Sequence, residues 1–140
     1  MLITSYKNYG APNKQQYWTT NWINEINSIL TPIIVDDFIF TVSNNGYLFT
    51  LQKKQGNIIK INNLYKNYDQ KKRKSVKPTG FSIGSNKLYL SNSDGNLIII
   101  NLNSGDVLKA VKVARDFISK PYVQDGNLFV VKNGSIIQYD

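Results

Sequence analysis

Two kinds of side chain in this 140-residue sequence could do chemistry, namely a run of adjacent cations and a set of scattered carboxylates. The cations are Lys71, Lys72, Arg73 and Lys74, in a polar segment, residues 67–77, that shows no hydrophobic period. Short charge runs usually form solvated loops. The alternative is a loop that faces an anion, such as phosphate, a lipid headgroup or an acidic patch on a protein. The run therefore predicts either a solvated loop or weak, salt-sensitive anion binding.

The carboxylates do not form a set suited to catalysis or to metal binding. We expect Asp116 to form a loop salt bridge with Arg115. The other carboxylates of interest fall in turns between predicted strands, where Asx turns explain them: Asp36, Asp37, Asp94, Asp106 and Asp125. No carboxylate pair is spaced for acid–base work. The sequence therefore predicts no catalytic residue, no metal site and no cofactor.

Composition excludes several further classes of chemistry. The sequence contains neither cysteine nor histidine, which rules out disulfides, thiolate sites and every Ser-His or Cys-His arrangement. The net charge of +8 favours nucleic acid as a partner. However, no recognition helix or RNA-binding motif is present, so we expect no specific nucleic-acid binding. No apolar run is long enough to span a membrane, and residues 1–6 lack the features of a signal peptide.

The elements that position these side chains are organised around residues 87–113. Three short apolar runs alternate there with two turns that contain Gly95 and Gly105. Runs of this kind predict strands buried on both faces, and a tight hairpin needs the positive φ that glycine adopts readily. The segment is therefore predicted to be a three-stranded antiparallel meander, which needs a sheet on each side.

The same pattern occurs before and after this meander. Gly46 and Gly56 precede Gly95 and Gly105 by 49 positions each, and Gly134 follows Gly95 by 39. A period of about 40–50 residues that carries several short strands is typical of a β-propeller. The alternative is a β-sandwich in which these glycines mark ordinary hairpin turns.

We therefore predict an all-β fold, a partial β-propeller of about two and three-quarter four-stranded antiparallel blades plus an N-terminal strand. In that strand Trp18, Trp22 and Ile26 share one side, as a packing group or as a platform for ligand stacking. The predicted segments are a loop (1–16), the outer strand of a preceding blade (17–28), a blade (29–65), a basic loop (66–79), a second blade (80–114) and an incomplete blade (115–140).

About four blades is the usual minimum for a closed ring. We therefore expect the chain to be the C-terminal portion of a longer propeller. A small open domain and an oligomeric ring are the alternatives.

Several motifs resemble the repeat of the pyrroloquinoline-quinone-type (PQQ-like) propeller family. Trp22, Thr31-Pro32 and the Asn45-Gly46 hairpin carry the first match, which continues into the turn at Gln55-Gly56. Asp94-Gly95 with Ser104-Gly105 gives a second match, and Asn133-Gly134 a partial third.

One departure from this repeat concerns the contacts between blades. The family usually has a tryptophan four residues after the second glycine, where it docks one blade on the next. Lys60 and Lys109 occupy these positions here. We expect either looser blades or a lysine stem that covers the seam.

The resemblance implies two functions. Some members are quinoprotein dehydrogenases, and others are cofactor-free protein scaffolds, such as the propeller lipoprotein of the outer-membrane β-barrel assembly machinery. This chain is closer in character to the scaffold. We expect a non-catalytic protein–protein interaction domain, periplasmic or associated with the outer membrane, with a role in outer-membrane protein assembly. Its partners are other proteins, bound through blade loops, with weak contact to anionic surfaces through Lys71–Lys74. The alternative is the C-terminal fragment of a PQQ-dependent quinoprotein dehydrogenase.

Overall fold

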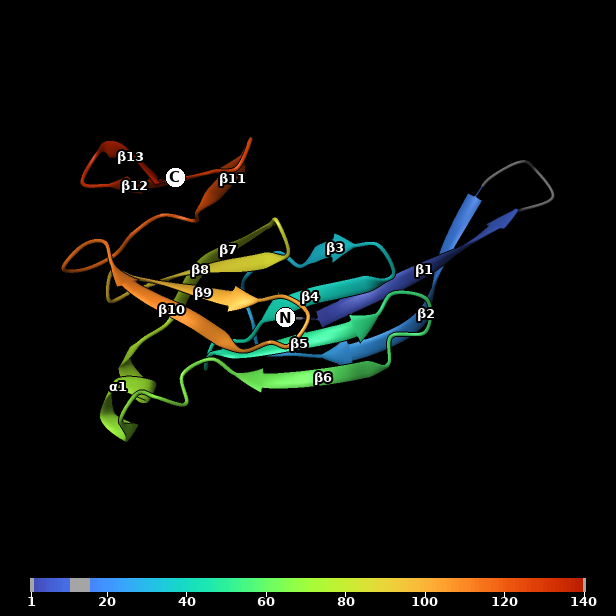
Figure 1. Ribbon diagram of the computed structural model, residues 1–140. Coiled ribbons are helices and arrows are strands. Elements are labelled where there is room, and N and C mark those ends of the chain that lie inside the picture. Colours follow the sequence, from blue (N-terminus) through green and yellow to red (C-terminus); the bar gives the residue numbers. More distant parts are fainter. Residues whose placement is uncertain (1, 11–15, 140) are drawn as a thin grey trace.

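The computed structural model describes the backbone of residues 2–10 and 16–139 and the side chains of residues 22–139. Antiparallel sheets of short strands follow one another along the chain and stack face to face (Figure 1). Within this described part the sheets have two, four, four and three strands in chain order, and a single helix lies between the two complete ones. The prediction of an all-β partial propeller is confirmed.

Three of these sheets are successive blades, and each is an up-and-down meander. Blade 1 consists of β3 (Ile33–Val35), β4 (Phe38–Val42), β5 (Tyr47–Gln52) and β6 (Ile58–Asn63). Blade 2 consists of β7 (Pro78–Gly84), β8 (Lys87–Asn92), β9 (Asn96–Asn101) and β10 (Val107–Lys112). Blade 3 consists of β11 (Tyr122–Gln124), β12 (Asn127–Lys132) and β13 (Ser135–Tyr139). The turn glycines Gly46, Gly56, Gly95, Gly105 and Gly134 have φ between +74° and +83°.

The N-terminal region differs from the expected loop followed by one strand. Residues 2–10 form strand β1 (Leu2–Gly10), which pairs antiparallel with β2 (Gln16–Glu25). The polar sequence of residues 1–16 predicts a loop. Pairing with β2 instead gives the backbone of residues 2–10 its hydrogen bonds, which a polar sequence does not reveal. The side chain of Trp18 lies outside the described residues.

The basic segment also differs from the prediction, because it is helical. Helix α1 (Gln70–Ser75) begins after Asp69, whose Oδ1 accepts a hydrogen bond from the Lys72 backbone N–H at 2.8 Å. The helix buries no residue, so it needs no hydrophobic period, and its Lys, Arg and Gln residues have good helix propensity. Strand β7 then begins at residue 78, inside the predicted 66–79 loop.

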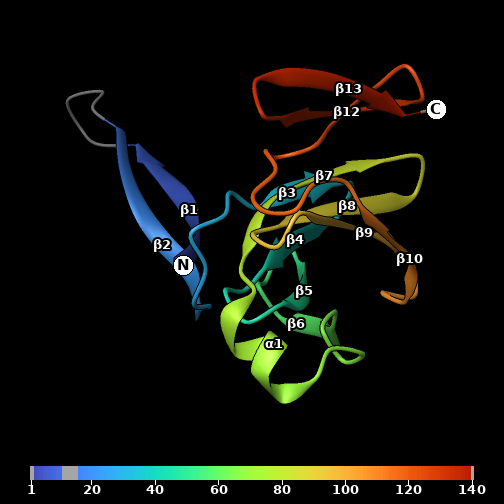
Figure 2. The same cartoon turned by 90° about the vertical axis from the view of Figure 1, so that its left-hand side faces the viewer.

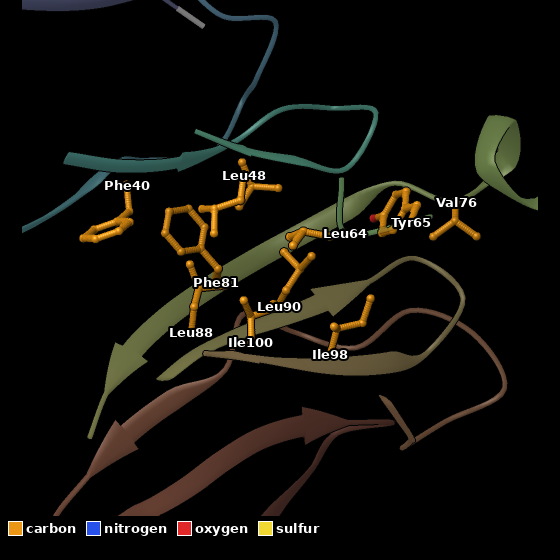
Figure 3. Packing of buried hydrophobic residues seen from close by; sticks show 11 residues of the cluster. Phe40, Leu48, Leu64, Tyr65, Val76, Phe81, Leu88, Leu90, Ile98 and Ile100 are labelled. Atoms are coloured by element: carbon orange, nitrogen blue, oxygen red, sulfur yellow. The ribbon is translucent and has the colours of Figure 1, made fainter. Parts of the chain in front are cut away.

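The core lies in the seams between blades. Blade 1 contributes Phe40, Val42 and Leu48 to the first seam, which blade 2 fills with Phe81, Leu88, Leu90, Ile98 and Ile100 (Figure 3). In the second seam Leu97 and the connection residue Ile118 pack against Leu128 and Val130 of blade 3. Alternate strand residues point to opposite faces, so each blade has a forward face toward the next blade and a rear face toward the preceding one. No helix in the described residues is long and apolar enough to cross a membrane.

Candidate functional site: a basic pocket beside helix α1

Helix α1 lies on the connection between blades 1 and 2 and projects from one rim of the stack (Figure 2). Lys72 holds it against blade 2, because its Nζ lies 3.4 Å from Asp94 Oδ2 and 4.3 Å from the centre of the Tyr68 ring. The Tyr68 ring in turn stacks on Tyr65 with 5.1 Å between centroids. The ammonium group of Lys72 is thus engaged in contacts within the fold and is not free to bind a ligand.

Arg73 also has a structural task. Its Nε donates to the Tyr68 carbonyl at 2.7 Å and its Nη2 to the Lys66 carbonyl at 2.6 Å. Both carbonyls belong to the connection that leads into α1. The guanidinium therefore ties the helix to the connection before it. Carbonyl groups carry no net charge, so the positive charge of Arg73 remains at the rim.

Two tyrosines anchor the start of the connection. Tyr65 is buried, and its hydroxyl donates to Asn92 Oδ1 of blade 2 at 2.6 Å. Burial raises the pKa of Tyr65 strongly, and the neighbouring Tyr68 and Asp94 raise it further. The pKa of Tyr68 is also raised, first by burial and then by the Asp94 charge. Both hydroxyls therefore stay protonated at neutral pH, so they supply no base.

A pocket of about 400 Å³ opens beside the helix. It is lined by Asn45, Tyr47, Asn63, Gln70, Arg73, Lys74 and Lys77. Three of these residues are cations and none is a carboxylate. The ammonium groups of Lys74 and Lys77 have no ion-pair partner within the described residues.

The amide residues of the pocket contribute hydrogen-bond donors. Asn45 Oδ1 accepts from Ser43 Oγ at 2.5 Å, and Asn63 Oδ1 accepts from the Tyr65 backbone N–H at 3.0 Å. Each amide oxygen is thus engaged within the fold, whereas neither NH₂ group has an acceptor among the described residues and each can donate to a ligand. A pocket lined by cations and amide donors suits a carboxylate or a phosphate group.

The structure separates the four cations that the sequence singled out. Arg73 and Lys74 line the pocket, Lys72 pairs with Asp94, and Lys71 is exposed and does not line it. Lys77, Gln70 and the two asparagines were not predicted; they come from the connection, the helix, a turn and the end of strand β6. The basic character of residues 67–77 was the only signal, and it extended to Lys77.

The carboxylates give no second site. Arg115 and Asp116, both within the described residues, form no ion pair, so the expected loop salt bridge is absent. Among the described residues no three Asp or Glu side chains gather as a metal site would require. We therefore assign no described residue to a metal or to a quinone cofactor.

The seams between blades show how the missing tryptophans are replaced. A Cβ on Gly56 would overlap the ring of Trp22, so the N-terminal hairpin docks on blade 1 by a tryptophan–glycine contact. Asn62 takes the same place over Gly105 of blade 2. Beside it, Lys60 Nζ donates to the Asn103 carbonyl at 2.6 Å, so this lysine reaches across the seam to the turn of blade 2.

The corresponding outer part of the second seam is open. Counting 49 positions on from Lys60 and Asn62 gives Lys109 and Val111. Both line a cavity of about 340 Å³ together with Gly126 and Tyr139 of blade 3. Blade 3 presents no third turn there within the described residues, so these side chains have no turn to bind.

Comparisons with known proteins agree with this architecture. No family model and no curated protein matches the sequence. Among solved structures, BamB from Moraxella catarrhalis superposes with a TM-score of 0.63 at 14% identity, over 86% of this chain and 33% of that one. The quinohemoprotein alcohol dehydrogenase ADHIIG from Pseudomonas putida HK5 gives 0.61 at 19% identity, over 83% and 19%. The computationally designed Ika8 protein gives 0.58 at 11% identity, over 77% and 31%.

The chain thus spans a third or less of the length of these three proteins. Its fold is that of the PQQ-like propeller repeats, as the sequence resemblance predicts. The identities are too low to carry any function across.

Proposed function

We propose that this chain is a non-catalytic propeller segment that serves as a protein-interaction scaffold, and that it holds an acidic segment of its partner in the pocket beside α1. The observation that carries this proposal is the pocket lining, with three cations, amide donors and no carboxylate. A partner carboxylate can bind Lys74 and Lys77 without displacing an internal ion pair.

The placement of the pocket favours a protein partner. It draws on a blade turn, the end of a strand and α1 together, so a peptide that lies across the rim can contact all three at once. The likeness to BamB supports the scaffold role. On the same ground we propose a periplasmic or outer-membrane-associated location and a part in outer-membrane protein assembly.

Binding of a glutamate octapeptide to the full chain, followed by calorimetry at low salt, tests this proposal. The variant Lys74→Ser/Lys77→Ser should weaken binding at least about tenfold, because two charge-assisted contacts are lost. The matched control Lys54→Ser/Lys71→Ser removes the same charge from exposed residues outside the pocket and should lose much less.

Equal losses of affinity in the two variants would show that the peptide is attracted by net charge alone. This result would overturn the proposal that the pocket binds it. Anionic vesicles and inorganic phosphate serve as further probes. If either probe binds more tightly than the peptide, and if this binding depends on Lys74 and Lys77, the ligand is that anion and not an acidic protein segment.

The quinoprotein dehydrogenase fragment is the second candidate, because solved quinohemoprotein alcohol dehydrogenases share the fold. Dye-linked alcohol oxidation by the chain with added quinone and calcium would support it. We expect no oxidation under these conditions.

A further inference from the structure

Large apolar side chains are exposed on the forward face of blade 3. Ile136 is 75% exposed, whereas Leu48 and Leu97, which also follow the turn glycine by two positions, are 1% and 2% exposed. Val131 is 43% exposed, and its counterpart Val42 is fully buried. In blades 1 and 2 these positions are covered by the rear face of the following blade. The forward face of blade 3 is therefore built like a seam but lacks its cover.

The edge of blade 3 shows the same incompleteness in its backbone. Strands β5 and β9 each pair with an outer strand, β6 and β10 respectively. Strand β13 holds the equivalent position, and within the described residues it pairs with β12 alone. Its outer row of N–H and C=O groups is thus free to accept a further strand.

The N-terminal sheet is incomplete in the opposite way. It contains the outer strand of a blade, whereas blade 3 contains the three inner strands. Strand β2 is already docked as an outer strand, because Trp22 covers Gly56 as Asn62 covers Gly105. Among the residues that the structure describes, the sheet of β1 and β2 lacks the two inner strands that would accompany it. As a result Ile34 on the rear face of blade 1 is 58% exposed, whereas its counterparts Ile83 and Val123 pack in the two seams.

We propose that a second copy of this chain covers the forward face of blade 3. Strand β13 of one copy pairs with β2 of the other in place of β1, so that β11, β12 and β13 with β2 form one complete four-stranded blade. The forward face of that blade then lies on the rear face of the second copy's blade 1 and covers Ile34. The proposal continues the two internal seams and does not depend on the pocket beside α1.

The blades within the described residues indicate the size of the assembly that we propose. Each copy brings two complete blades and the three strands of another, so two copies joined head to tail at both ends make six blades. Propellers have about four to eight blades. A head-to-tail contact makes a ring when its rotation closes, and six blades lie within that range.

Sedimentation and light scattering of the full chain across a concentration series test the assembly, with a dimer expected. Ile136→Asp should raise the dissociation constant at least about tenfold, because a charge would be buried in the seam. The fold of one copy should persist, since this side chain is exposed. Leu108→Asp, a change at a 53% exposed residue outside both open seams, is the control and should dimerise as the parent does.

Mixing variants tests the head-to-tail geometry. Ile34→Asp should weaken self-association as Ile136→Asp does, since it alters the other side of the same seam. An equimolar mixture should form a heterodimer, because one of its two contacts is unmodified on both sides. A chain that is monomeric at all concentrations, or a mixture that stays monomeric, would overturn the proposal.

Cross-linking tests the strand register. In the complete blades Tyr47 pairs with Asn63 and Asn96 with Lys112, so Ser135 of one copy should pair with Ile23 of the other. The chain has no cysteine. The variant Ile23→Cys/Ser135→Cys should therefore give a disulfide-linked dimer on mild oxidation, and each single variant should give much less. Equal cross-linking by the single variants would exclude this register.

Discussion

The two seams of this molecule share a centre and differ at their outer edge. In both, apolar residues of neighbouring blades interdigitate, with Leu48 against blade 2 and Leu97 against blade 3. In the first seam Lys60 and Asn62 also bind the turn of the next blade. In the second seam Lys109 and Val111 line an open cavity. The second seam is thus stacked without polar contacts at its outer edge, where such contacts depend on a complete neighbour.

The largest effect is expected at the centre of the first seam. Phe81→Ala removes a 2% exposed ring between blades 1 and 2 and should lower the free energy of unfolding by about 3–5 kcal/mol. Ile136→Ala, in the uncovered face of blade 3, should change it by less than about 1 kcal/mol in the monomer. Urea unfolding at a concentration where the monomer prevails measures both. Similar losses would mean that the face of blade 3 is covered within one copy.

Glycine substitutions separate backbone strain from collision with a neighbouring part of the chain. Gly46→Val should cost about 1–3 kcal/mol or more, because positive φ is strained and a Cβ would overlap the Tyr65 ring. Gly134→Val has the same strain, but no atom lies near its Cβ, so its cost should fall at the low end of that range. Thermal melts of the two variants give the difference, and equal midpoints would assign the whole cost to strain.

Tyr65 makes the first seam sensitive to alkali. Its folded-state pKa is raised above the ordinary value of 10.0, so the unfolded chain loses its proton first as pH rises. The contribution is therefore complete below about pH 10 and is lost as pH rises above it. Melts between pH 8 and 11 should show falling stability near pH 10, with a smaller fall in Tyr65→Phe. The same fall in both proteins would place the alkaline titration elsewhere.

The smallest expected effect on the free energy of unfolding is at the outer edge of the first seam, where Lys60 contacts blade 2. Lys60→Met removes the hydrogen bond to Asn103 and should cost about 0.5–1 kcal/mol, since the site is partly exposed. Lys109→Met, at the matching position of the second seam, should cost nothing measurable. Hydrogen exchange at the amides of residues 103–105 should rise in the first variant only.

The repeats were predictable because their signals are local. Gly46 and Gly95 mark hairpins through backbone sterics, and β-branched runs mark strands between them. Strand β1 was missed because its pairing partner, rather than its own polar residues, makes it a strand. Helix α1 was missed because a helix that buries nothing shows no period.

The candidate site was predictable only in part. The run Lys71–Lys74 pointed to the correct segment, but its charges face different ways once the chain turns into a helix. Whether a lysine is free depends on partners distant in sequence, as Asp94 shows for Lys72. Asn45 and Asn63 reach the pocket because the segment of α1 lies beside blade 1, which no local pattern reports.

Helix α1 is held from both sides and buries nothing itself, and this has a use in engineering. Tyr65 and Val76, on either side of it, are 1% and 3% exposed, so the two ends of the segment are fixed in the core. Residues 70–75 between them could be exchanged for a foreign recognition peptide at modest cost to folding, because the contacts that are lost, Lys72–Asp94 and the two Arg73 hydrogen bonds, lie at the surface. The rim of the propeller thus offers a graft site with preorganised ends, at which new specificity can be introduced while the blades stay unchanged.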